Sequence, residues 1–156
     1  MEVKTLTKGC SVSEWRDTSK MQMVYSNLSD QPYTLKIEGG EEKVSVAWSY
    51  TPTIRDGYEG AITAISEYGW ICQAFVKYEA AGDLLVSNGL WKRSDEDGDF
   101  MIGWSSNGED SGLKRYYSKQ GTVGSEDYYE NGAEKEFEAL SVELQEAVEN
   151  QKQFLD

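Results

Sequence analysis

Eight side chains in this sequence have the types and positions needed to bind a small molecule. Seven carry aromatic rings and one is an arginine, and all fall on segments that favour strands: Trp48, Tyr50, Trp70, Phe75, Trp91, Trp104, Arg115 and Tyr117. Aromatic rings with polar tips suit a site that is mostly apolar and has a few fixed hydrogen-bonding groups. We therefore expect a small apolar or aromatic ligand in a β-barrel pocket. The same rings would also suit an ordinary aromatic core.

The arginine in this set is the strongest candidate for contacting a charged group. Arg115 lies between Leu113 and Tyr117, and strict alternation places the three side chains on one face of a strand. An arginine that points into an apolar interior is costly unless a carboxylate meets it, either from a ligand acid group or from an internal Asp or Glu. The alternative is that Arg115 faces solvent. Lys92 and Arg93, beside an acidic turn, are expected to form a surface pair.

The sequence does not indicate catalysis or metal binding. It contains no histidine, which removes Ser-His and Cys-His pairs, imidazole ligands and proton transfer by histidine. The acidic run at 95–99 lacks the pattern of an EF-hand calcium loop, because Phe100 and Ser106 stand where glycine and glutamate are needed. We predict an acidic turn there, with no metal, no cofactor and no catalytic residue. This favours a binding protein, and the remaining alternative is an enzyme that uses Tyr, Asp or Glu side chains inside the barrel.

The formal net charge is −13, from 28 acidic and 15 basic residues. Such a charge keeps a protein soluble and repels nucleic-acid phosphates, so we expect no direct nucleic-acid binding. It also attracts basic proteins, and residues 126–149 contain nine acidic residues against one basic. The alternative to ligand binding is therefore an acidic protein-interaction or inhibitor module that imitates nucleic acid towards a basic partner. Solubility alone is the simplest explanation of the charge.

Alternating apolar residues and short turns predict a mostly β, antiparallel meander. The two-residue period runs from Tyr33 to Lys119, with turn residues at 39–42, 81–83, 94–99 and 107–112 and an interruption at Asn88-Gly89. Short connections join neighbouring antiparallel strands, and about eight such strands commonly close into an up-and-down barrel. We expect one domain over residues 1–156, with the barrel or meander at 21–119.

The C-terminal segment 133–154 is predicted to be an α-helix. Its residues favour helices, and a mainly apolar stripe recurs at three- and four-residue spacing: Phe137, Leu140, Leu144, Ala147, Val148 and Gln151. Such a stripe must dock, most simply on the domain's own sheet and alternatively on a partner protein. A short helix is also expected at 12–20, because Ser11 and Glu14 form a capping-box pattern.

A strand meander followed by a helix is similar in layout to lipocalin-like barrels. The resemblance implies an up-and-down barrel. The Gly-x-Trp signature of that family is missing, because Gly9 and Trp15 have the wrong spacing.

The sequence shows no signal for export or membrane insertion. No apolar segment follows Met1, and no run of about 18 apolar residues is present. Only two cysteines occur, Cys10 and Cys72, so a disulfide framework is not expected. We predict a cytoplasmic protein with reduced thiols and no membrane partner.

Overall fold

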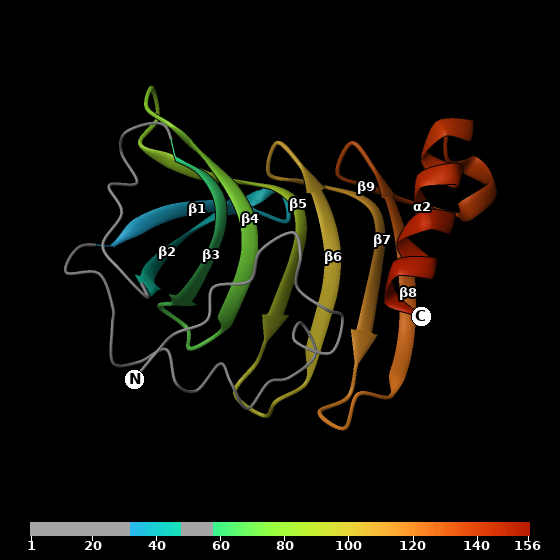
Figure 1. The fold of residues 1–156 in the computed structure, drawn as a ribbon, viewed down its shortest axis with the longest axis horizontal. Helices are drawn as coiled ribbons and strands as arrows, with labels where there is room; N and C mark the ends of the chain where they lie inside the picture. Colours follow the sequence, from blue (N-terminus) through green and yellow to red (C-terminus); the bar gives the residue numbers. More distant parts are fainter. Residues whose placement is uncertain (1–31, 48–57) are drawn as a thin grey trace.

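The computed structural model describes residues 32–47 and 58–156, which form a β-protein with one C-terminal α-helix (Figure 1). Nine strands are described: β1 (Tyr33–Ile37), β2 (Gly40–Ala47), β3 (Glu59–Ser66), β4 (Ile71–Glu79), β5 (Leu84–Ser94), β6 (Phe100–Ser106), β7 (Glu109–Tyr117), β8 (Val123–Glu130) and β9 (Ala133–Lys135). A short 3-10 helix, η2 (Phe137–Ala139), precedes α2 (Val142–Leu155). The helix predicted at 12–20 and the strand predicted near Met21 lie outside the described residues.

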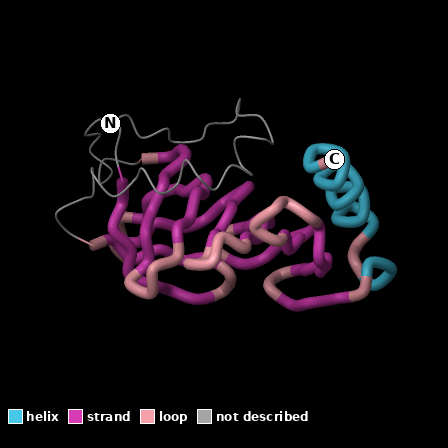
Figure 2. The backbone as a smooth tube through the Cα atoms, turned by 90° about the horizontal axis from the view of Figure 1, so that it is seen from below, coloured by secondary structure: helices cyan, strands magenta, loops and turns pink. Residues whose placement is uncertain are grey.

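The first five described strands close into a small barrel. Each strand pairs antiparallel with the next, and β1 also pairs parallel with β5, through Thr34–Lys36 and Leu84–Val86. The second half of β5, Gly89–Ser94, pairs with β6 instead. Strand β5 therefore completes the barrel and also begins an open wing, β6–β9, which extends the sheet toward α2 (Figure 1, Figure 2).

The mostly β, meandering architecture and a closed β-barrel are confirmed, but the predicted number and pairing of the strands in the ring are wrong. The prediction had about eight antiparallel strands in the ring, whereas the ring has five and its pairing is mixed. An odd number of strands in a meander leaves the first and last strands running in the same direction, so closure must be parallel. The register between β4 and β5 shifts opposite Phe75, at the predicted Asn88-Gly89 interruption. This shift separates the part of β5 that pairs with β1 from the part that pairs with β6, so the barrel closes at β5.

Three two-residue turns set the hairpin geometry. In each turn both residues have positive φ, as in a type I′ turn, whose twist matches that of the paired strands: Glu38-Gly39, Asn107-Gly108 and Asn131-Gly132. The turn predicted at 107–112 is therefore shorter, because β7 already begins at Glu109. The third turn joins β8 to β9, where the sequence predicted the beginning of a helix.

Two apolar cores lie on opposite faces of the sheet, since adjacent residues of β5 belong to different cores. One core fills the barrel and includes Leu35, Val44, Ile62, Ala74, Leu85 and Trp91. The other lies between the wing and α2 and includes Leu90, Phe100, Ile102, Leu113, Tyr117 and Val148. Strand β4 is buried on both faces, as its sequence predicted.

Helix α2 docks on strand β7, which confirms that its apolar stripe packs on the domain's own sheet. The β7 chain bulges between Asp110 and Lys114, where three residues oppose a single residue of β6. Within the bulge, the backbone N–H of Leu113 donates a hydrogen bond to Oε1 of Gln151 on α2, at 2.9 Å. The helix thus satisfies a backbone group that the irregular strand leaves available.

The helix begins at Val142, nine residues later than predicted (142 against 133). Its N-cap is Ser141, whose Oγ accepts a hydrogen bond from the backbone N–H of Leu144 at 3.3 Å. The preceding residues form β9 and η2 because the turn after β8 sends the chain back along that strand. Among the described residues, no helix has both the length and the apolar character needed to cross a membrane.

Candidate functional site

The predicted ligand-binding residues are not gathered in one place. Trp48 and Tyr50 lie outside the described residues. Trp91 is fully buried inside the barrel. Trp70 precedes β4, is half-buried, and places its ring over the guanidinium of Arg93, at 4.9 Å.

The other three predicted rings lie on the opposite face, in the core next to α2. Phe75 and Trp104 pack against the edge of this core, and Tyr117 is buried within it. Tyr117 stacks on Phe100 with the ring centroids 4.8 Å apart, and Trp104 meets Phe154 of α2 edge-on. These rings hold the helix on the sheet.

Arg115 points inward and is paired with carboxylates of the same chain. Its guanidinium lies 2.9 Å from Oδ1 of Asp156 and 3.2 Å from Oε1 of Glu126. It also donates to the hydroxyl of Tyr117 at 3.4 Å. The sequence left three possible surroundings for Arg115: a ligand acid group, an Asp or Glu of the protein, or solvent. The structure shows Asp and Glu side chains of the protein, which already balance the charge of Arg115.

Side chains of the barrel strands occupy the barrel interior. Trp91 belongs to the barrel core, and its indole packs on Gly103 of the neighbouring strand β6. Even a barrel of about eight strands is only just wide enough for its own side chains or one small ligand. A ligand inside this five-strand ring would have to displace them.

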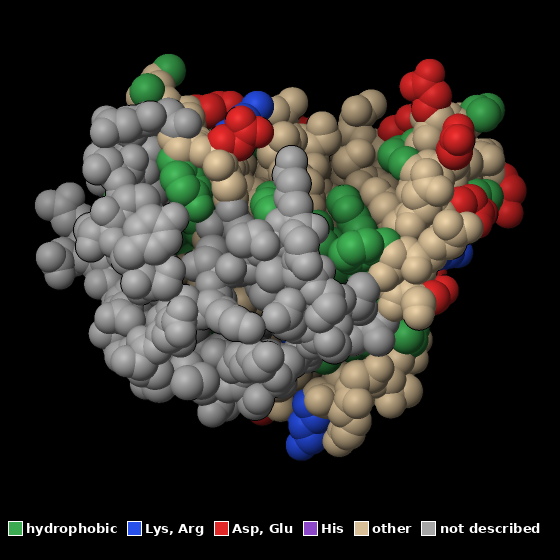
Figure 3. Space-filling model, in the orientation of Figure 1, with side chains coloured by type: hydrophobic (Ala, Val, Ile, Leu, Met, Phe, Trp, Pro, Cys, Tyr) green, Lys and Arg blue, Asp and Glu red, His purple; other side chains and the backbone are tan. Residues whose placement is uncertain are grey.

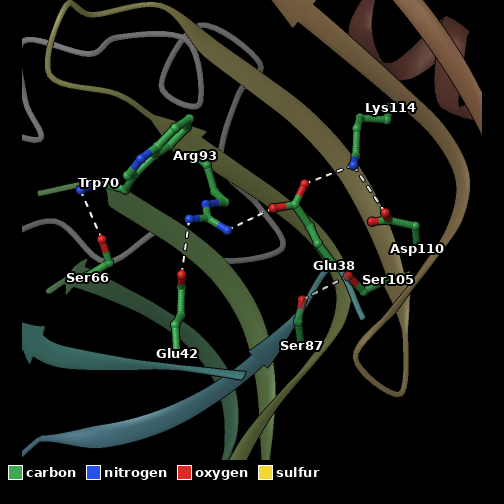
Figure 4. Close-up of polar contacts among 9 residues, drawn as sticks. All are labelled: Glu38, Glu42, Ser66, Trp70, Ser87, Arg93, Ser105, Asp110 and Lys114. Atoms are coloured by element: carbon green, nitrogen blue, oxygen red, sulfur yellow. Dashed lines mark hydrogen bonds and ion pairs between the residues drawn. The ribbon is translucent and has the colours of Figure 1, made fainter. Parts of the chain in front are cut away.

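A charged cluster lies where the barrel meets the wing (Figure 4). Glu38, in the β1–β2 turn, contacts Arg93 of β5 and Lys114 of β7, each at 2.8 Å. Arg93 also contacts Glu42 of β2 at 3.3 Å, and Lys114 contacts Asp110 of β7 at 3.1 Å. We call these five residues the junction cluster.

Two local irregularities bring the junction cluster together. Glu38 adopts a positive φ of 54°, a strained conformation for a residue other than glycine, asparagine or aspartate, and so presents its carboxylate to both cations. Along a regular strand, the Cα atoms of Asp110 and Lys114 would lie ~13 Å apart. The β7 bulge shortens this separation, so that their charged groups meet.

Aromatic rings surround the two cations of the cluster. Trp70 covers Arg93, and its backbone N–H donates to Oγ of Ser66 at 3.0 Å, which fixes the turn that carries the ring. The ammonium of Lys114 lies 4.7 Å from the ring centre of Tyr129 and 5.7 Å from that of Trp91. Trp70 and Tyr129 are half-buried, so these two rings also reach the surface.

The junction cluster and the adjacent Trp91 contain buried polar atoms that lack a hydrogen-bond partner among the described residues. They are two acceptors, Oδ1 of Asp110 and Oε1 of Glu42, and two donors, Nε of Arg93 and Nε1 of Trp91. Buried polar atoms in native proteins almost always have a partner, and leaving one unsatisfied costs about 1–3 kcal/mol. These four atoms mark the place where a small polar guest has hydrogen bonds to gain.

For both Asp110 and Lys114, burial and the oppositely charged partners shift the pKa in opposite directions. Burial raises the pKa of Asp110 above its usual value of 3.8, against the attraction of Lys114. For Lys114, burial acts to lower the pKa, but hydrogen bonds and charges from Glu38 and Asp110 outweigh it and raise the pKa above 10.5. Lys114 therefore remains an ammonium ion at neutral pH and is unsuited to nucleophilic attack.

Sequence reasoning missed most of this cluster. Lys92 and Arg93 were expected at the surface, but both are buried, on opposite faces of β5. Two-residue alternation could have placed Arg93 inside, because Trp91 lies two positions away on the same strand. No such signal joins Asp110 to Lys114, because their meeting depends on the bulge.

The cluster offers fixed charges, hydrogen-bonding groups and half-buried aromatic rings, which together suit reversible binding. Among residues 32–47 and 58–156, no group of three or more His, Cys, Asp or Glu side chains is arranged to hold a metal ion.

No family model, no curated protein and no solved structure matches this chain.

Proposed function

We propose that the protein binds a small aromatic molecule at the junction cluster, at the rim of the barrel. The observation that carries the proposal is a set of unpartnered buried donors and acceptors in a cluster whose two cations contact half-buried aromatic rings. Aromatic walls with a few fixed polar groups are typical of small-molecule sites. The narrow five-strand ring favours a site at the rim of the barrel over one in its interior.

The cluster also has the rigidity that a binding site needs. Its members come from the β1–β2 turn and from strands β2, β5 and β7, which belong to one continuous sheet. Each charged group forms at least one ion pair within 3.3 Å. Side chains fixed in this way lose little freedom on binding, so less of the interaction energy is lost to ordering.

Titration of intrinsic tryptophan fluorescence with a panel of small aromatic compounds tests the proposal. Trp70→Phe should remove most of the ligand-induced change, because Trp70 lies over Arg93 at the site. The matched control is Trp104→Phe, whose ring lies against α2. Loss of the signal in both variants alike, or no response to any compound in the panel, would contradict the proposal.

The acidic surface supports a second candidate function, capture of a basic protein. Acidic side chains gather over the C-terminal helices in Figure 3, where Glu138 of η2 and Glu143, Glu146 and Glu149 of α2 are exposed. The nearby lysines are already paired, Lys135 with Glu130 at 3.2 Å and Lys152 with Glu126 at 3.6 Å. The unbalanced carboxylates would attract a basic partner such as a nucleic-acid-binding protein.

Charge reversal on α2 tests this second candidate. A triple variant, Glu143→Lys, Glu146→Lys and Glu149→Lys, should abolish low-salt retention of basic proteins, and retention by the wild type should fall steeply with salt. The control places the same three charges elsewhere, at Glu67, Glu96 and Asp97, which are also exposed. Equal losses in the two triple variants would show that net charge acts without a defined surface.

A further inference from the structure

Counted over the described residues, the junction cluster carries more negative than positive groups. Three carboxylates, Glu38, Glu42 and Asp110, share two cations, Arg93 and Lys114. The side chains of Asp110 and Lys114 are less than a tenth exposed, at 9% and 8%. Charges that are removed from water interact strongly with one another, so an additional positive group would be favoured there.

The unpartnered acceptors show where that positive group would bind. Oδ2 of Asp110 holds Lys114, while Oδ1 is buried and has no partner among the described residues. Oε1 of Glu42 is likewise buried and has no hydrogen-bond partner among the described residues. An ammonium group has donors only and suits a carboxylate oxygen with free lone pairs.

The aromatic rings at this site are already used to contact cations. Trp70 lies over the guanidinium of Arg93, and Tyr129 lies over the ammonium of Lys114. Rings of this kind attract positive charge and also pack against an aromatic guest. A ligand with a carboxylate would instead meet the excess negative charge, and both cations of the cluster are already in ion pairs.

We propose that the ligand is a small aromatic amine whose protonated amino group donates a hydrogen bond to Oδ1 of Asp110. This inference rests on the proposed function and specifies its ligand class. It replaces the expectation of a ligand acid group at Arg115, which is paired with Glu126 and Asp156 on the other face of the sheet. The net charge of −13 would further raise the local concentration of such cations at low salt.

Isothermal titration calorimetry with three probes of one carbon skeleton tests the inference: 2-phenylethylamine, 2-phenylethanol and phenylacetate. At neutral pH we expect the amine to bind at least about tenfold more tightly than the alcohol, and phenylacetate to bind most weakly. Asp110→Asn should lower the affinity for the amine about tenfold and leave that for the alcohol unchanged. Circular dichroism checks the fold, and Glu42→Gln provides a second variant with the same expected direction.

The matched control is Glu146→Gln, which removes one negative charge from the exposed surface of α2. It should leave the affinity for the amine unchanged, because its effect is screened by solvent and salt. Equal affinities for amine and alcohol, or an equal loss of both in Asp110→Asn, would overturn the inference while leaving ligand binding intact. Absence of binding by every aromatic compound tested would overturn the proposed function as well.

Discussion

Gly103 and Trp91, on adjacent strands, are in such close contact that only glycine fits: a Cβ atom at Gly103 would lie 2.6 Å from Cζ2 of the indole. Trp91 is fully buried and cannot move aside without disturbing the barrel core. Gly103 has an ordinary φ, so its role is to make space and not to permit an unusual backbone. The contact joins the barrel to the wing at β6.

Gly103→Ala should lower the free energy of unfolding by about 1–3 kcal/mol, because the added methyl group overpacks the indole. The matched control is Gly40→Ala, where the nearest atom to the new Cβ lies 4.0 Å away. Urea denaturation followed by circular dichroism measures both. Equal stability of the two variants would show that the barrel accommodates the methyl group.

The buried Arg115 side chain should contribute more to stability than its exposed partner Asp156. The Asp156 side chain is 70% exposed, so Asp156→Asn should change the free energy of unfolding by less than about 1 kcal/mol. Arg115→Ala should cost about 3 kcal/mol, since it removes a buried side chain together with its ion pairs to Glu126 and Asp156 and its hydrogen bond to Tyr117. Urea denaturation compares the two variants, and similar losses in both would contradict this ranking.

Much of the sheet follows from the sequence, because local alternation determines which segments become strands. Strand β6 coincides with the alternation of Phe100, Ile102 and Trp104. Strand β8 was missed because it is rich in acidic residues and is nowhere fully buried, so its apolar alternation is weak. The turn at Asn131-Gly132, a typical hairpin signal, was the available indication of β8 and β9.

The closure of the barrel and the candidate site were harder to predict, because both depend on contacts between distant residues. The parallel pairing of Leu35 with Leu85 has no local signature. The ion pair between Glu38 and Arg93 joins residues 55 positions apart. Composition did indicate a wealth of rings and carboxylates, but only the three-dimensional register places them around shared cations.

Cys72 should be chemically inert in the native protein. Burial raises the pKa of its thiol to about 12, and the nearby positive charge of Arg93 only partly offsets this. Because the thiolate is the reactive form, a chromogenic disulfide reagent at pH 8 should label Cys72 only after urea is added. The experiment uses a Cys10→Ser background, so that a single thiol reports. Complete labelling within the mixing time in native buffer would contradict the prediction.

The contribution of Asp110 to stability should change with pH in the direction opposite to that of an ordinary ion-paired carboxylate, whose pKa is lowered on folding. Burial raises the pKa of Asp110 in the folded protein above 3.8, so the folded state binds the proton more tightly than the unfolded state does. The stability of the wild type relative to Asp110→Asn should therefore be greatest below pH 3.8 and should fall as the pH rises through the raised pKa, becoming constant above it. Urea denaturation of both proteins between pH 3 and pH 7 measures this difference. An increase with pH would mean that the attraction of Lys114 outweighs burial, which would weaken the argument that Asp110 is available to an additional cation.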